Sequence, residues 1–341
     1  LGAARRLTAR WRMLPPPDLV VTGFNGQLDV LLARRLAGRH ARLVFAPLVT
    51  LTETLVDDRR VYRRGGPKAR LAAALDRRTL ESPDLVLLDT ETHRAYVAER
   101  LTAHARTATL YLGAEQLFAP VPARCRRIGD TLRVLFYGQY VPLHGVRVII
   151  EAAALVGPRA GLELTMIGTG PDRAAAERLA RACDCTHIRF EDWVPYERLP
   201  ERLAECDVAL GVFGLTPKAR MVIPTKIYQA AAVGRAIVTG ETPALREIFT
   251  PGGDVLAVPR GDPGALAAAL RRLRDTPDLA PRLGTAAARL LAEHLDRSAQ
   301  GTRLLALLAS AFPDLRDRLV AAPLSTESDL GGCRGGASAG E

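Results

Sequence analysis

The residues whose types and spacing best suit chemistry lie in one elbow, where a buried strand turns into a helix over residues 211–230. We expect the loop of this elbow to carry Lys218 and Arg220, and Pro224 to open the helix. Proline in a first helical turn leaves the other N–H groups of that turn pointing outward, where they form a nest for an anion. Lys226 adds a positive charge to this nest. The pattern predicts a phosphate-binding site, and the alternative is a solvated basic loop.

Lysine usage supports the phosphate site. The chain has only three lysines, Lys68, Lys218 and Lys226, although arginine is abundant. Two of the three flank the helix start, where Ile223 and Thr225 complete the segment. Because a chain that otherwise uses arginine keeps lysine here, we predict that Lys226 and Lys218 flank a phosphate-binding site.

Two further strand-to-helix elbows each contain a pair of glycines. Gly138 and Gly145 bracket a loop that also carries His144, and we expect this loop to fold over a diphosphate. Gly168 and Gly170 follow an apolar run, and such a turn lets the backbone approach a phosphate or a sugar. From the residues alone, a purely structural turn at the second elbow and a solvated His144 are equally good interpretations.

Composition excludes several classes of protein. The formal net charge of +10 comes mostly from arginines spread along helices rather than from one basic tract, so we expect no nucleic-acid partner. No apolar run approaches the roughly 18–20 residues that span a bilayer. Five irregularly spaced cysteines predict reduced thiols in a cytoplasmic protein, with a peripheral membrane contact left open. Only Cys183, Cys185 and His187 approach metal-ligand spacing, so we predict neither a metal nor a cofactor.

Apolar strands alternate with helical stretches in both halves of the chain, which is typical of parallel βα units. The expected strands are 19–23, 42–48, 84–89 and 107–113 in the first half, and 133–138, 162–168, 187–194, 208–213, 236–239 and 254–258 in the second. The expected helices of the first half are 29–37, 69–80 and 93–105. We therefore predict an α/β fold of two Rossmann-like domains.

A stretch interrupted by prolines and arginines divides the two halves. The predicted parts are a first domain at 1–120, a linker at 121–131, a second domain at 132–300, a C-terminal helix at 301–321 and a disordered tail at 322–341.

Seven short motifs follow one another in the second half. They are residues 136–138, 142–145, 167–171, 193–196, 206–211, 223–238 and 242–247. Together, within residues 133–263, they resemble the donor-binding domain of the family 4 (group 1) glycosyltransferases, which have the GT-B fold and transfer sugars with retention. The resemblance implies two parallel sheets that face each other across a cleft. It also implies a nucleotide-diphosphate sugar as donor and a glycan, lipid-linked or small-molecule acceptor.

Four positions depart from the residues usual in that family. Gln139 and His144 stand where the family has an arginine and a lysine that bind the diphosphate. Met221 and Gln229 stand where it commonly has two glutamates, one near the transferred sugar and one on the ribose. Gln229 can still hydrogen-bond a ribose hydroxyl, whereas Met221 cannot usefully contact a polar sugar group. The resemblance thus implies a divergent subgroup in which Lys226 supplies much of the charge.

The family's acceptor domain normally begins with a strand, a glycine-rich turn and a helix, and residues 1–17 are instead basic and then proline-rich. The resemblance therefore implies that a segment of roughly fifty residues is missing from the first domain.

The resemblance also assigns the rest of the site. Gln27 is the counterpart of a histidine that retaining GT-B enzymes often place close to the sugar, and residues 89–93 are a second candidate for the acceptor side. On a purely structural interpretation, Thr92 is expected to cap the helix that follows. The base is expected to rest against Trp193, Val194 and Pro195.

The chemistry implied is a metal-independent front-side attack, in which the leaving diphosphate accepts the acceptor's proton. Lys226 stabilises the leaving group, with help from Lys218 or Arg220. Three alternatives stay open. The first is a catalytically degenerate GT-B partner or regulatory subunit of a glycosyltransferase, which Gln139 and Met221 favour. The second is a nucleotide-sugar epimerase, and the third is a nicotinamide dehydrogenase, weakened by the missing third glycine of the dinucleotide fingerprint.

Overall fold

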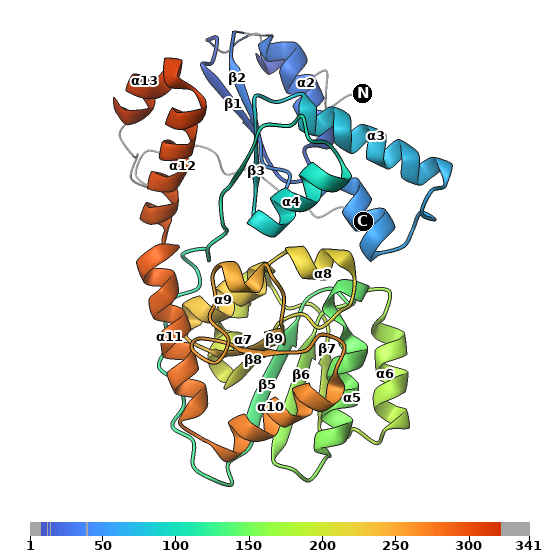
Figure 1. Cartoon of the computed structure of the whole chain (residues 1–341). Coiled ribbons are helices and arrows are strands. Elements are labelled where there is room, and N and C mark those ends of the chain that lie inside the picture. Colours follow the sequence, from blue (N-terminus) through green and yellow to red (C-terminus); the bar gives the residue numbers. More distant parts are fainter. Residues whose placement is uncertain (1–7, 12, 14, 39, 322–341) are drawn as a thin grey trace.

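The structure, a computed structural model, describes residues 8–321 except 12, 14 and 39. Two parallel sheets, each covered by helices, form two domains that lie one above the other in Figure 1. The predicted α/β fold of two Rossmann-like domains is confirmed. Among the described residues, no helix is long and apolar enough to cross a membrane.

The N-terminal sheet has four parallel strands in the order β1-β2-β3-β4. The strands are β1 Leu19–Thr22, β2 Arg42–Phe45, β3 Leu85–Leu88 and β4 Thr107–Thr109. One face is covered by α2 Gln27–Ala37, α3 Pro67–Glu81 and α4 Glu91–Arg100. Side chains alternate between the faces along β3, so Val86 and Leu88 pack toward the helices while Leu85 and Leu87 point to the opposite side.

The C-terminal sheet has six parallel strands in the order β10-β9-β8-β5-β6-β7. The strands are β5 Leu132–Tyr137, β6 Leu162–Ile167, β7 Ile188–Glu191, β8 Val208–Leu210, β9 Ala236–Gly240 and β10 Leu256–Val258. The chain runs outward from β5 in one direction and from β8 in the other. Open α/β sheets bind ligands at such a switch point, beyond the carboxyl ends of the strands.

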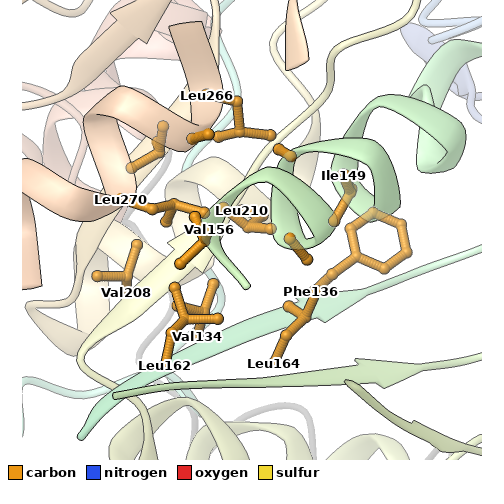
Figure 2. Packing of buried hydrophobic residues seen from close by; sticks show 14 of the residues in the cluster. Val134, Phe136, Ile149, Val156, Leu162, Leu164, Val208, Leu210, Leu266 and Leu270 are labelled. Carbon is orange, nitrogen blue, oxygen red and sulfur yellow. The ribbon is translucent and has the colours of Figure 1, made fainter. Parts of the chain in front are cut away.

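Helices cover both faces of the C-terminal sheet. One face carries α5 Val146–Val156, α6 Arg173–Ala182 and α10 Pro263–Asp275, and the other carries α7 Leu199–Glu205, α9 Thr225–Val233 and α11 Leu279–His294. Figure 2 shows the first face, where Phe136, Leu164 and Ile149 interdigitate in a fully apolar layer. This core fixes the strand ends from which the site loops emerge.

After α11, the chain returns to the N-terminal domain. Helix α12 Arg297–Ala311 runs up beside the first domain in Figure 1 and is followed by α13 Arg316–Ala321. Leu308, Phe312 and Leu315 pack on the face of the N-terminal sheet opposite α4. The helix expected over 301–321 is therefore divided in two. The tail predicted to be disordered, 322–341, lies outside the described residues.

One element was not predicted, and two local expectations were wrong. Residues Thr52–Asp58 form a π-helix that no sequence pattern indicated. The expected loop with Lys218 is a short helix, α8 Pro217–Met221, because the Thr216 side chain accepts a hydrogen bond from the N–H of Ala219. Helix α4 is capped by Thr90 rather than Thr92.

Candidate functional site

Three glycine-containing loops pack against one another at the carboxyl ends of β5, β6 and β8. A side chain on Gly168 would place its Cβ 2.2 Å from the carbonyl oxygen of Gly138, and one on Gly170 would lie 2.6 Å from the Tyr140 nitrogen. Gly214 is held equally close to the carbonyl oxygen of Pro142, at 2.2 Å. The loops can approach only because these positions lack side chains, which leaves backbone groups lining the switch point.

Lys226 points into this junction from the first turn of α9. A Cβ on Gly138 would lie 2.8 Å from its Nζ. The side chain is only 6% exposed, and its Nζ has no hydrogen-bond partner among the described residues. The ring of Phe136 lies under the ammonium group, at 4.2 Å from Nζ to the ring centroid. Burial lowers the pKa of Lys226 to about 7.

The helix start differs from the prediction in one detail. Pro224 is the N-cap residue, with an extended ψ of 144°, rather than a member of the first turn. Thr225 is therefore the first helical residue and is exposed, while the side chain of Ile223 is buried in the core. The first N–H groups of any helix lack intrahelical partners, so α9 presents them beside Lys226.

His144 is buried rather than solvated, which decides one of the alternatives left open by the sequence. Its ring lies edge-on to Phe136, with centroids 5.5 Å apart, and its Nδ1 donates to the carbonyl oxygen of Gln139. Burial, with the charge of Lys226, holds the pKa of His144 well below its usual range. The imidazole is thus neutral, and it orders the Gln139 loop instead of supplying charge.

A basic residue that the sequence did not indicate reaches the same loop from the other domain. Arg59, directly after the π-helix, donates from Nη2 to Oε1 of Gln139 at 3.0 Å. Gln139 follows Gly138 in the chain, so Arg59 contacts the loop that borders the Lys226 junction. No pattern around Arg59 distinguishes it from the other arginines of residues 59–64, because the contact depends on how the domains face each other.

Gln229 lies within a polar cluster that also contains Tyr137, Tyr196 and Glu115. The Tyr137 hydroxyl donates to Oε1 of Gln229 at 2.8 Å, and Nε2 of Gln229 donates to the Tyr196 hydroxyl at 2.9 Å. The Tyr196 hydroxyl in turn donates to Glu115 at 2.6 Å. Tyr137 was not predicted as a site residue, since only the fold brings it next to Gln229, which is distant in sequence.

Trp193 stands beside the second glycine elbow. Its indole is 48% exposed, and its Cη2 would lie 3.3 Å from a Cβ on Gly168. Val194 is half-buried and Pro195 exposed in the same segment. The structure therefore offers an exposed aromatic face next to the backbone of residues 168–170.

Lys218 lies in the contact between the domains. Its Nζ donates to Oγ1 of Thr54 at 2.9 Å and lies 3.4 Å from Oε1 of Glu53, both in the π-helix. Glu53 also contacts Nε2 of His93 at 2.8 Å, and Nδ1 of His93 contacts Asp89 at 2.6 Å. Burial alone would lower the pKa of His93, but the two carboxylates raise it to about 10. In this structure the charge of Lys218 thus faces a buried carboxylate of the first domain.

The remaining predicted residues lie apart from the Lys226 junction. Gln27 is buried at the start of α2, where its Nε2 donates to the carbonyl oxygen of Val49 at 3.0 Å. The Met221 side chain is buried, and its carbonyl oxygen accepts from Thr90 Oγ1 at 2.5 Å. Arg220 is exposed on α8 and lines a separate cavity between the domains. Among the described residues, no three His, Cys, Asp or Glu side chains group as metal ligands would.

The fold is that of the GT-B glycosyltransferases, because solved members of that class superpose on most of the chain. Sucrose-phosphate synthase from Thermosynechococcus elongatus matches with a TM-score of 0.70 and 19% identity, over 87% of this chain and 74% of that protein. Alr3699/HepE of Anabaena, solved with UDP and glucose, matches with a TM-score of 0.70 and 14% identity, over 91% and 81%. Residues 131–276 match the family described as Glycosyl transferases group 1. This match lies in the second domain, over the region whose motifs predicted the resemblance.

Curated relatives agree with this assignment. The chain is 26% identical to alpha-D-kanosaminyltransferase of Streptomyces kanamyceticus over 272 residues, which cover 79% of this chain and 61% of that protein. It is 29% identical to D-inositol 3-phosphate glycosyltransferase of Thermomonospora curvata over 178 residues, which cover 48% of this chain and 40% of that protein. The matches therefore span less than two thirds of the length of either relative.

Proposed function

We propose that the chain is a retaining glycosyltransferase that moves a hexose-type sugar from a nucleotide-diphosphate sugar to an acceptor hydroxyl on a glycan, lipid-linked or small molecule. The observation that carries this proposal is the buried, unpartnered ammonium group of Lys226 beside Gly138. A buried charge without a partner is costly, since burial removes its hydration. The diphosphate of a donor provides the missing partner, and the helix start of α9 favours the same anion.

In the proposed reaction, the bond between C1 of the sugar and the diphosphate oxygen breaks while the acceptor oxygen bonds to C1 from the same face. The acceptor proton passes to the departing phosphate oxygen, so charge and atoms balance. Lys226 and the first amides of α9 stabilise the negative charge that grows on the diphosphate. Because they already supply positive charge, we propose that the transfer needs no metal.

Other contacts suggest how the donor is oriented. We propose that the base stacks on the exposed ring of Trp193 and that Gln229, within the Tyr137 and Tyr196 cluster, contacts the ribose. Arg59 adds a second cation from the facing domain through its contact with Gln139. We propose that Arg59 and Lys226 hold the diphosphate from opposite sides when the donor is bound.

The test is calorimetric titration with a panel of sugar nucleotides, beginning with UDP-glucose because a structural neighbour was solved with UDP and glucose. Donor hydrolysis is followed in parallel with excess EDTA. Binding together with slow hydrolysis that survives EDTA supports a metal-independent transferase. Failure of every sugar nucleotide to bind would contradict the proposal and favour a catalytically degenerate partner of a transferase.

A further inference from the structure

A second hollow lies between the domains, where α4 faces α8 (Figure 1). Its volume is about 570 Å³, within the range of about 300–1,000 Å³ that is usual for small-molecule sites. The wall is formed from both domains and includes Tyr96, Arg100, Arg220, Met221, Pro243 and Arg260. The part of the wall from the C-terminal domain follows β8, β9 and β10, and none of Lys226, Gly138 and His144 lines the cavity.

Three arginines from different elements line this cavity. Arg100 ends α4, Arg220 lies on α8 and Arg260 follows β10. Burial and the charge of Arg220 both lower the pKa of Arg260, because the two guanidinium groups lie close enough to repel each other. Arg260 is held there by donating to the carbonyl oxygens of Gly214 and Thr216, at 3.1 and 3.4 Å.

Carboxylates do not neutralise the three arginines of the cavity. None of the three arginines forms an ion pair among the residues that the structure describes. Asp57 lies in the wall, but its two oxygens are occupied by Arg64 at 2.6 Å and by the Tyr96 hydroxyl at 2.9 Å. Glu99 is the one other acidic residue of the wall, and it is exposed on α4. The cavity therefore keeps an excess of positive charge.

The geometry points to a binding site for a phosphorylated acceptor in this cavity. Guanidinium groups bind phosphate through paired, charge-assisted hydrogen bonds, and two of them held together against repulsion gain most from a shared anion. Pro217 and Pro243 provide an apolar wall for the remainder of the molecule. Met221 belongs to the same wall and lies four residues before Thr225 in the chain. This inference rests on the proposed transferase function.

The test compares a free and a lipid-borne phosphomonoester. Glycerol 3-phosphate and phosphatidic acid in mixed micelles are each titrated into the whole protein, alongside UDP-glucose. Arg220→Ala and Arg220→Glu are compared with Arg178→Ala, an exposed arginine on α6 that is outside the cavity. We expect each Arg220 variant to lose at least tenfold in affinity for glycerol 3-phosphate, and Arg178→Ala to bind as the wild type does. Stronger binding of phosphatidic acid than of glycerol 3-phosphate, with the same loss in the Arg220 variants, identifies a lipid as the source of the phosphate.

Two outcomes overturn the inference and leave the donor site untouched. One is wild-type affinity of both Arg220 variants for the phosphomonoesters, measured on protein whose melting temperature is unchanged. The other is a loss of affinity for UDP-glucose alone, which would return Arg220 to the diphosphate site predicted from the sequence. If the wild type does not bind UDP-glucose, the proposed transferase function is contradicted instead. The failure of this inference and the failure of the proposed function therefore give different results.

Discussion

The ammonium group of Lys226 lies 4.2 Å from the centroid of the Phe136 ring and has no hydrogen-bond partner among the described residues. The ring face offers partial compensation for the charge, since cation–π contacts contribute about 0.5–2 kcal/mol. It does not replace the hydrogen bonds that three N–H donors require. The free protein therefore carries an unsatisfied cation that an anion can complete.

Burial of Lys226 makes the stability of the free protein depend on pH. The folded pKa of about 7 lies below the ordinary 10.5, so between these values the unfolded chain binds the extra proton. Stability due to this residue therefore rises as the pH increases from about 7 toward 10, by up to about 1.4 kcal/mol per unit. Urea unfolding at several pH values from 6.5 to 9.5 measures this rise in the free energy of unfolding.

Two methionine variants separate this effect from other titrating groups. Lys226→Met should lack the rise and should be more stable than the wild type at pH 6.5, because it buries no charge. Lys68→Met is the matched control, since Lys68 is exposed and should keep the wild-type dependence. Parallel curves for the wild type and Lys226→Met would show that Lys226 is not buried as described.

Donor affinity should depend on pH through the same group. Above about pH 7 the free protein loses the Lys226 proton, which must be regained for the cation to meet the diphosphate. Affinity for UDP-glucose should therefore fall by up to tenfold per unit between pH 7.5 and 9. The phosphates of a sugar nucleotide do not titrate in this range. A flat affinity across it would mean that Lys226 is charged throughout or does not contact the donor.

Trp193 should matter for the nucleotide and not for the phosphates. Stacking of a base on an aromatic side chain contributes about 1–3 kcal/mol, so Trp193→Ala should weaken UDP binding by about five- to a hundredfold. Inorganic pyrophosphate lacks a base and should bind equally well to both proteins. Trp193→Phe keeps a flat ring and should restore most of the affinity. An equal loss for pyrophosphate would indicate that Trp193 supports the Gly168 elbow instead.

The pair between Lys218 and Glu53 should join the two domains. Removing one partner of a buried ion pair costs about 3–5 kcal/mol because the other charge stays buried. Lys218→Met should lower the free energy of unfolding by less than this, because Glu53 keeps its contact with His93. The double change Lys218→Met with Glu53→Gln should cost less than the sum of the single changes. A double-mutant cycle measured by urea unfolding gives the coupling. Additive effects would mean that the contact does not stabilise the domain arrangement.

Most of the fold was predictable because its strands are short apolar runs bounded by glycine and proline. β6, for example, is the run before Gly168, and the structure ends it at Ile167. The π-helix Thr52–Asp58 was not predictable, since its polar side chains find partners distant in sequence, as in the contact of Thr54 with Lys218 of the other domain. No local pattern encodes such a contact.

The site was only partly predictable for the same reason. The carboxyl ends of parallel strands share one edge, so the closeness of Gly138 and Gly168 follows from the topology. Burial of Lys226 and His144 depends on how closely the loops pack, which the sequence does not reveal. The contact of Arg59 with Gln139 and the pairing of Lys218 with Glu53 depend on how the two domains are arranged relative to each other.

The central claim is that Lys226 binds the diphosphate of the donor. Calorimetric titration of UDP-glucose into the wild type, Lys226→Met and Lys68→Met at pH 6.5 tests it most directly. We predict at least a hundredfold loss of affinity for Lys226→Met, in a protein at least as stable as the wild type, and no change for Lys68→Met. Wild-type affinity in folded Lys226→Met would contradict the account.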